Sequence, residues 1–137
     1  MTTQPRTMNP VVHFEMPYRD ARRAAAFYAA AFGWQAQMLG PEMGDYVVVT
    51  TALSDAKPGA PAGAINGGLF PYKADWPAQY PGVVIGVEDL RVAMGRVTAA
   101  GGEVLGEPMA IPGIGDYVAF VDSEGNRHAM LRPLMPG

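Results

Sequence analysis

The sequence contains no cysteine, so disulfides, thiolate metal sites and thiol nucleophiles are all excluded. Basic residues are also few: ten Lys and Arg, none in a run, give a formal net charge of −3 and no electrostatic footprint for nucleic acid or an anionic membrane. No apolar stretch reaches the roughly 18 residues of a membrane span, and the polar N-terminus has no signal-peptide core. We therefore expect a cytoplasmic protein with neither nucleic acid nor membrane partners.

Several catalytic motifs are missing as well. The chain has no P-loop, no G-x-G-x-x-G after a strand, no H-E-x-x-H and no G-x-S-x-G nucleophile elbow. What it does have is 49% hydrophobic residues, enough for a sizeable core, together with 17 Gly and 13 Pro, which favour short elements joined by many turns. A length of 137 residues fits one ordinary domain or two very small halves.

Two blocks of the sequence occur twice in the same order. Residues 20–34 and 89–103 align on an Asp, an Arg, an Ala and a Gly at equal spacing. Further on, residues 41–47 (PEMGDYV) match residues 112–118 (PGIGDYV). Because self-similarity of this kind marks repeated architectures, the chain is predicted to be a tandem duplication of one structural unit.

Each copy reads as a strand, a helix and three further strands. The first has β-prone runs near residues 11–16, 35–39, 45–51 and 63–70, and a helix between its N-cap Asp20 and Gly33. The second has runs near residues 83–87, 103–105, 117–121 and 127–132, and a helix over 90–100 capped by Asp89. In the first helix an apolar stripe is predicted to face the sheet, formed by Ala24, Phe27, Tyr28 and Ala31.

The predicted fold class is therefore α+β, with two tandem βαβββ modules. We expect the modules at residues 10–72 and 81–134, joined by a linker at 73–80. Residues 1–9 are predicted to be a flexible tail, followed by a single domain over 10–137.

These motifs resemble the vicinal oxygen chelate superfamily, which includes glyoxalase I, bleomycin-resistance proteins and extradiol dioxygenases. The resemblance covers about residues 10–133 and rests on His-x6-Asp ending at Asp20, on AFY at 26–28, on AFGW at 31–34, and on the turn DSEGN at 122–126. It implies two modules whose sheets curl around a shared cleft, often in a homodimer.

Enzymes of this superfamily typically hold one divalent metal between the first and last strands of the two modules, where it polarises two neighbouring substrate oxygens. His13 matches the first ligand position, but the corresponding positions in the second module hold Gly82 and Ala129, and the remaining strand offers only Asn66 as a weak ligand. His128 is adjacent, but a one-residue step turns it to the opposite face. Since a transition-metal site needs about three protein ligands, we expect no tightly held metal and no other cofactor, with a weakly bound divalent metal left open.

His13 and Glu15 are the candidate catalytic residues. Side chains alternate along a strand, so both face the cleft if either does, while Phe14 and Met16 turn towards the helix. His13 is open to three interpretations: a metal ligand, a general base or hydrogen-bonding group in the cleft, or a core histidine. Glu15 needs a wet cleft or a basic partner, for which Arg127 is the candidate, in a ligand site or in a structural ion pair.

The predicted ligand-binding residues also include Tyr46, Asn66 and Tyr117. Tyr46 and Tyr117 occupy equivalent places in the two copies, where they either line the cleft from both modules or pack within the sheet. Asn66 and the two glycines after it form either a ligand-contacting segment or a bend. Trp76, in the linker, is interpreted as a lid over the cleft or a dimer contact.

These observations predict a glyoxalase- or bleomycin-resistance-like protein that binds a small organic molecule in the cleft without a tightly held metal. The alternative is a metal-dependent lyase, isomerase or dioxygenase that acts on a vicinal-oxygen substrate through His13 and Glu15. A third hypothesis is sequestration of a drug or metabolite. The sequence leaves open whether the protein is an enzyme, and a homodimer is expected from the resemblance.

Overall fold

The computed structural model describes residues 8–52, 65–76 and 79–134. In chain order its elements are β1 (Val11–Tyr18), α1 (Ala21–Phe32), β2 (Gln35–Met38), the short 3-10 helix η1 (Pro41–Met43), β3 (Val47–Thr50), β4 (Gly67–Pro71), β5 (Gly82–Gly86), α2 (Leu90–Ala99), β6 (Glu103–Ile111), β7 (Gly115–Val121) and β8 (Arg127–Pro133).

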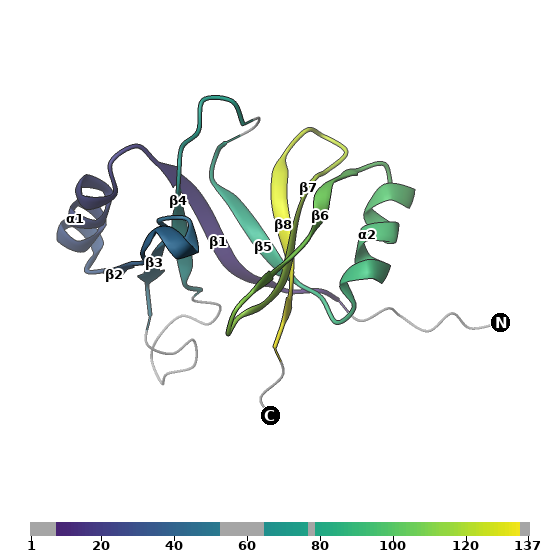
Figure 1. Ribbon diagram of the computed structural model, residues 1–137, viewed down its shortest axis with the longest axis horizontal. Coiled ribbons are helices and arrows are strands. Elements are labelled where there is room, and N and C mark those ends of the chain that lie inside the picture. The colour runs from purple at the N-terminus through teal and green to yellow at the C-terminus, as the bar shows by residue number, and fades with distance from the viewer. Residues whose placement is uncertain (1–7, 53–64, 77–78, 135–137) are drawn as a thin grey trace.

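All eight strands form one mixed sheet in the order β2-β3-β4-β1-β5-β8-β7-β6. The two halves of this order repeat each other outward from the centre, where β1 and β5 pair antiparallel with Glu15 opposite Gly82. Within each half the first and last strands pair parallel, β1 with β4 and β5 with β8. Figure 1 shows α1 and α2 at opposite ends of the long axis with the sheet between them. The predicted α+β class and the duplicated βαβββ pattern are confirmed.

Both helices begin as predicted. The side chain of Asp20 accepts a hydrogen bond from the Arg23 backbone N–H at 3.0 Å, and Asp89 does the same for Val92 at 3.1 Å. Gly33 ends α1 in the left-handed region at φ 73°, which a residue without Cβ adopts at little cost.

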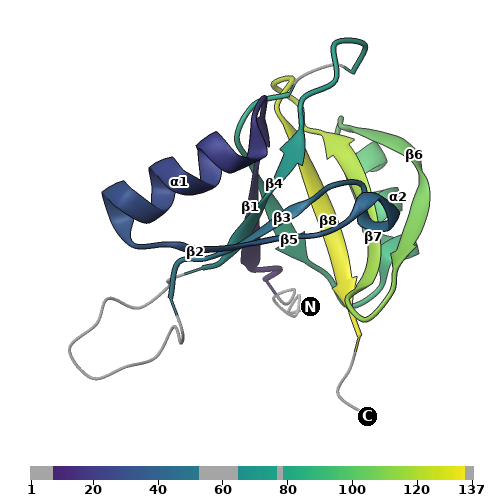
Figure 2. The same ribbon diagram turned by 60° about the vertical axis from the view of Figure 1, so that its left-hand side comes forward.

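The core consists of two apolar clusters, one beneath each helix. The first is built on Val47, Val49 and Leu69, and the second on α2 together with β7 and β8. The predicted stripe of α1 is wrong in part, because Phe27 is 58% exposed and Ala31 is exposed. Tyr28 instead makes the aromatic contact of this helix, stacked on Trp34 with ring centroids 4.7 Å apart, and Phe27 packs edge-on against Tyr28. Figure 2 shows α1 alongside the sheet from the side.

Three strands, β1, β3 and β6, have boundaries that differ from the predicted ones. β1 continues through Pro17 to Tyr18, because its pairing with β4 extends to Tyr18. Its pairing with β5 ends at Glu15, so on that side the missing N–H of Pro17 costs no ladder bond. β3 begins only at Val47, since Asp45 has φ 54°. β6 runs on to Ile111, with a register shift between Leu105 and Met109 that includes Gly106 at φ 83°.

Some predicted segments lie wholly or partly outside the described residues: the tail, the start of the strand predicted at 63–70, and part of the linker. Among the described helices, none has the length and apolar character needed to cross a membrane.

Candidate functional site

The two candidate catalytic residues lie on the face of the sheet turned away from both helices, here called the inner face. Phe14 and Met16 pack in the apolar cluster beneath α1, so alternation along β1 directs His13 and Glu15 to the opposite side. The predicted orientation of β1 is thus confirmed. Both side chains are partly buried.

Glu15 is held by two tyrosines, one from each module. Its Oε2 accepts a hydrogen bond from the Tyr46 hydroxyl at 2.9 Å, and its Oε1 accepts one from the Tyr117 hydroxyl at 2.7 Å. Hydrogen bonds to a charged acceptor are short and comparatively strong, which offsets the cost of placing a carboxylate in the middle of an apolar strand. We refer to Tyr46, Glu15 and Tyr117 as the tyrosine clamp.

Glycine on the neighbouring strand makes the clamp possible. Gly68 lies beside Glu15 in the parallel pairing of β1 with β4. A Cβ at Gly68 would lie 1.9 Å from the Tyr46 hydroxyl oxygen and 2.0 Å from its Cζ, so any side chain here would overlap the ring. The interpretation of Gly68 as a position of close approach is therefore supported, although the approaching group is a protein side chain.

His13 extends the clamp into a chain of hydrogen bonds. Its Nε2 lies 3.0 Å from the Tyr46 hydroxyl oxygen. A tyrosine hydroxyl has a single hydrogen, and in the clamp that hydrogen is donated to Glu15, so Nε2 of His13 must be the donor to Tyr46. Neutral His13 then carries its proton on Nε2, and its Nδ1 lone pair has no hydrogen-bond partner among the described residues.

Burial determines the ionisation of His13 and of the two tyrosines in this chain of hydrogen bonds. It lowers the pKa of His13, with the nearby charge of Glu15 acting in the opposite direction, so the imidazole is neutral at physiological pH. Burial also raises the pKa of Tyr46 and Tyr117 far above the ordinary phenol value of 10.0, and the charge and hydrogen bonds of Glu15 raise it further. Both phenols therefore remain protonated donors.

Arg127 lies on the inner face of β8. Met130 packs in the core cluster beneath α2, and side chains alternate along a strand, so Arg127 and Ala129 point to the opposite side. The charge of Arg127 is close enough to Tyr117 to oppose the rise in that phenol's pKa. Its guanidinium carbon lies 5.7 Å from the centre of the Trp76 ring. Arg127 thus connects the clamp to the loop between β4 and β5.

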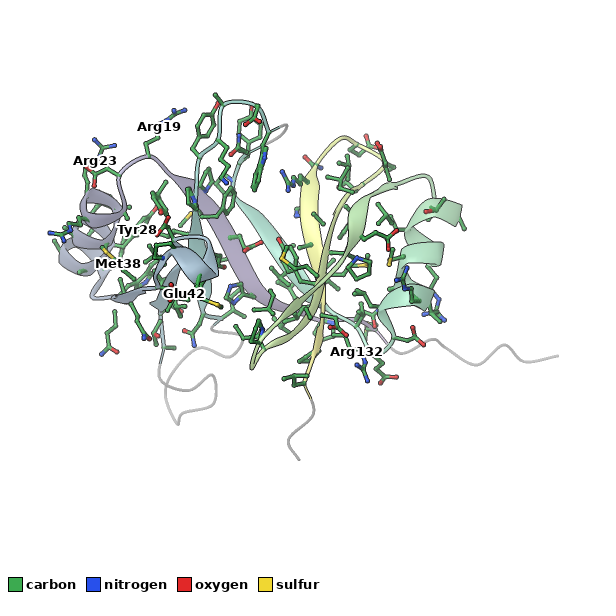
Figure 3. The ribbon with its side chains drawn as sticks, in the orientation of Figure 1. Arg19, Arg23, Tyr28, Met38, Glu42 and Arg132 are labelled. Carbon is green, nitrogen blue, oxygen red and sulfur yellow. The ribbon has the colours of Figure 1, made fainter. Side chains whose placement is uncertain are left out.

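A pocket of about 500 Å³ lies at this end of β1. It is lined by Pro17, Arg19, Tyr72, Trp76, Gln79, Tyr80 and Pro81. Pro17 shares the face of Glu15 by alternation, and Pro81 directly precedes Gly82, the strand partner of Glu15. The pocket therefore lies next to the tyrosine clamp along β1, although no clamp residue lines it. Figure 3 shows Arg19 at the same end of the molecule as this loop.

Asn66 and His128 have structural partners. The side-chain oxygen of Asn66 accepts hydrogen bonds from the backbone N–H groups of Thr51 and Ala52 at 2.7 and 3.1 Å, which fixes the end of β3. His128 faces away from the inner face, as predicted, and its Nδ1 accepts from the Val83 backbone N–H at 3.1 Å while its ring packs near Phe120.

The described residues do not form the divalent metal site that the resemblance to the superfamily implies. No group of three or more His, Asp or Glu side chains comes together within them. A Cβ at Gly82 would lie 2.7 Å from the Arg127 carbonyl oxygen, so a ligating side chain there needs a backbone shift. Glu15, the acidic group that lies near His13 among the described residues, already has both carboxylate oxygens engaged by the clamp.

Sequence reasoning missed that the tyrosines are partners of Glu15. It did identify Tyr46, Tyr117 and Glu15 separately as site residues, and the repeated GDYV was the signal for equivalent placement of the two tyrosines. Tyr117 is 102 residues from Glu15 in sequence, so only the folded sheet reveals the contact.

Comparison with known sequences gives one family match and two informative relatives. A family model described as "Bleomycin resistance protein-like N-terminal" matches residues 11–52. A glyoxylase-like domain-containing protein from Didymella fabae is 31% identical over 119 residues, which cover 85% of this chain and 88% of that protein. The anthracycline biosynthesis protein DnrV of Streptomyces peucetius is 33% identical over 134 residues, covering 87% of this chain but only 45% of DnrV.

Solved structures with the same fold are numerous. A hypothetical protein from Bacillus halodurans superposes with a TM-score of 0.67 at 12% identity, covering 96% of this chain and 99% of that one. Methylmalonyl-CoA epimerase of Streptomyces coelicolor gives a TM-score of 0.67 at 16% identity, with 94% and 100% covered. At these identities the structures support the fold alone.

Proposed function

The chain belongs to the vicinal oxygen chelate superfamily as a glyoxalase- and bleomycin-resistance-like member, and from that premise we propose that it binds a small organic molecule on the inner face, without a tightly held metal. The observation that carries the proposal is the hydrogen-bonded chain from His13 through Tyr46 and Glu15 to Tyr117. A convergent polar group of this kind beside a pocket is the usual form of a ligand site.

The ligand class is suggested by the relatives. DnrV is by name a protein of anthracycline biosynthesis, and anthracyclines are planar polycyclic aromatics with several oxygen substituents. A ligand of this class would place its oxygens against His13 and Arg127 and its rings against Trp76, which is 44% exposed. Binding and sequestration share this geometry, so both are forms of the same proposal.

The test is protein-observed NMR with a fragment library that includes an anthracyclinone, the polycyclic part of an anthracycline without its cationic amino sugar. We expect hits to shift the signals of His13, Tyr46, Tyr117 and Trp76, and to leave those of α2 unchanged. The Asp116→Asn variant, altered in an exposed surface ion pair, serves as a matched control and should bind equally well. Hits confined to the face of the sheet that carries the helices, or none at all, would contradict the proposal.

A second candidate is a proton-transfer enzyme, such as an isomerase or lyase, with His13 as general base. The Nδ1 lone pair of His13, which has no hydrogen-bond partner in the described part of the chain, favours it, because a base must present a free lone pair to its substrate. The metal-dependent version of this hypothesis has less support, since the described ligands do not form a metal site. Substrate-dependent turnover in metal-free buffer that is lost in His13→Ala tests the candidate, and turnover retained in this variant contradicts it.

A further inference from the structure

The pocket beside the tyrosine clamp is bordered by residues 72–76 and 79–81, where Gln79 hydrogen-bonds to the backbone of Lys73 and Trp76. Gln79 is 7% exposed, and its side-chain oxygen accepts from the Lys73 backbone N–H at 2.7 Å. Its side-chain nitrogen donates to the carbonyl of Lys73 and, at 3.0 Å, to that of Trp76. The backbone N–H of Tyr72 adds a bond to the Tyr18 carbonyl at 2.8 Å. These bonds hold the backbone at Tyr72, Lys73 and Trp76, from which the rings of Tyr72 and Trp76 project.

Three aromatic rings lie at this pocket with substantial exposure. Tyr72 is 37% exposed, Trp76 44% and Tyr80 74%. Exposed aromatic side chains around a pocket provide flat apolar surface for a planar ligand.

Positive charge is gathered on the same rings. The guanidinium carbon of Arg19 lies 4.0 Å from the centre of the Tyr72 ring, and the ammonium of Lys73 lies 4.7 Å from that of Trp76. Arg127 approaches Trp76 from β8. In the described part of the chain neither Arg19 nor Lys73 has a carboxylate partner, although the protein as a whole has a net charge of −3.

Two carboxylates are close in sequence to Arg19 and Lys73, and neither forms an ion pair with them among the described residues. Asp20 follows Arg19 in sequence, but its side chain caps α1. Asp75 is exposed in the loop and has no ion pair with the described residues. Arg19 and Lys73 are therefore open to an ion pair with the anionic group of a ligand at the mouth of the pocket.

We propose that this pocket binds the anionic group of a small aromatic ligand, with a phosphate, sulfate or carboxylate at Arg19 and the planar body against Tyr72, Trp76 and Tyr80. Arginine suits such groups because its planar guanidinium donates two parallel hydrogen bonds to them. The inference rests on the proposed function, since the pocket adjoins the clamp, and it defines the ligand as an aromatic anion.

The experiment titrates the protein with 1-naphthyl phosphate and follows the two tryptophan indole N–H signals by NMR. We expect a saturable shift of Trp76 and no shift of Trp34, which packs in the cluster beneath α1 and serves as an internal control. Neutral 1-naphthol and inorganic phosphate should each bind roughly tenfold more weakly, because 1-naphthol lacks the anionic group and inorganic phosphate lacks the aromatic ring. Equal binding of 1-naphthol, or a shift of Trp34 alone, would overturn the proposal.

Charge variants separate a specific site from general attraction. Arg19→Gln should weaken 1-naphthyl phosphate roughly tenfold, and Lys73→Gln should weaken it less. The matched control Arg91→Gln removes the same charge from an exposed position on α2 and should leave affinity within about twofold. Unchanged affinity in Arg19→Gln, with a native spectrum, would refute the pocket. If fragments still bind beside His13 in that variant, the proposed function stands without this inference, and if they bind nowhere in the wild type both fail.

Discussion

Substitution of Gly68 by alanine tests whether the tyrosine clamp requires a residue without a side chain at this position. The new Cβ would lie 1.9 Å from the Tyr46 hydroxyl oxygen and 2.1 Å from its Cε2, so the ring must leave its position. Losing a hydrogen bond to a charged acceptor costs about 1.5–3 kcal/mol, and replacing Gly by Ala returns roughly 0.4–1 kcal/mol through the unfolded state. We therefore expect the free energy of unfolding to fall by about 0.5–2.6 kcal/mol.

Urea unfolding of four proteins measures this effect: wild type, Gly68→Ala, Tyr46→Ala and the double variant. If the overlap with Tyr46 is the cause, Gly68→Ala costs almost nothing once that ring is absent, and the two substitutions are strongly non-additive. Gly95→Ala on α2 is the matched control, because open space surrounds its Cβ and the helix should gain about 0.8–1 kcal/mol. An equal loss from Gly68→Ala in both backgrounds, or no loss in either, would refute the reasoning.

Three further predictions concern ionisation, caps and metal content. In a spectrophotometric alkaline titration, Tyr46 and Tyr117 should ionise only on unfolding, because their folded pKa is raised above 10.0. The stabilisation that they give is therefore complete below pH 10 and is lost as the pH rises further. Ionisation of all tyrosines near pH 10 in the folded protein would contradict this. Asp20→Ala and Asp89→Ala should each lower the free energy of unfolding by about 1 kcal/mol in urea, and no change would remove the capping role. Tag-free protein should contain no near-stoichiometric nickel, zinc, iron or manganese by elemental analysis; a full equivalent would contradict the ligand assignment.

Local signals in the sequence account for much of the fold. Asp20, Asp89 and Gly33 mark helix ends because capping chemistry depends on a few adjacent residues. The repeat predicted two equal halves, and the strand order around β1 and β5 agrees with it. Prediction failed where tertiary context decides: Pro17 stays in a strand because β4 still pairs with it while β5 no longer does, and Phe27 is exposed despite its helical spacing.

The candidate site was predictable in its members but only partly in its contacts. Period-two alternation was enough to place His13 and Glu15 on one face. It suggested Arg127 as the partner of Glu15, whereas the hydrogen bonds found at its two oxygens come from Tyr46 and Tyr117. The pocket at Arg19 and Trp76 depends on the loop held by Gln79, a contact for which the sequence has no pattern.

The central claim is that the inner-face chain of hydrogen bonds recognises a ligand. The most direct test is isothermal titration of the strongest fragment hit into the wild type, Tyr117→Phe and His13→Ala, each checked for native folding by circular dichroism. Removal of either group should weaken binding roughly tenfold, the loss of one hydrogen bond to a polar ligand or to the carboxylate that orients it. Affinities unchanged in both variants would contradict the claim.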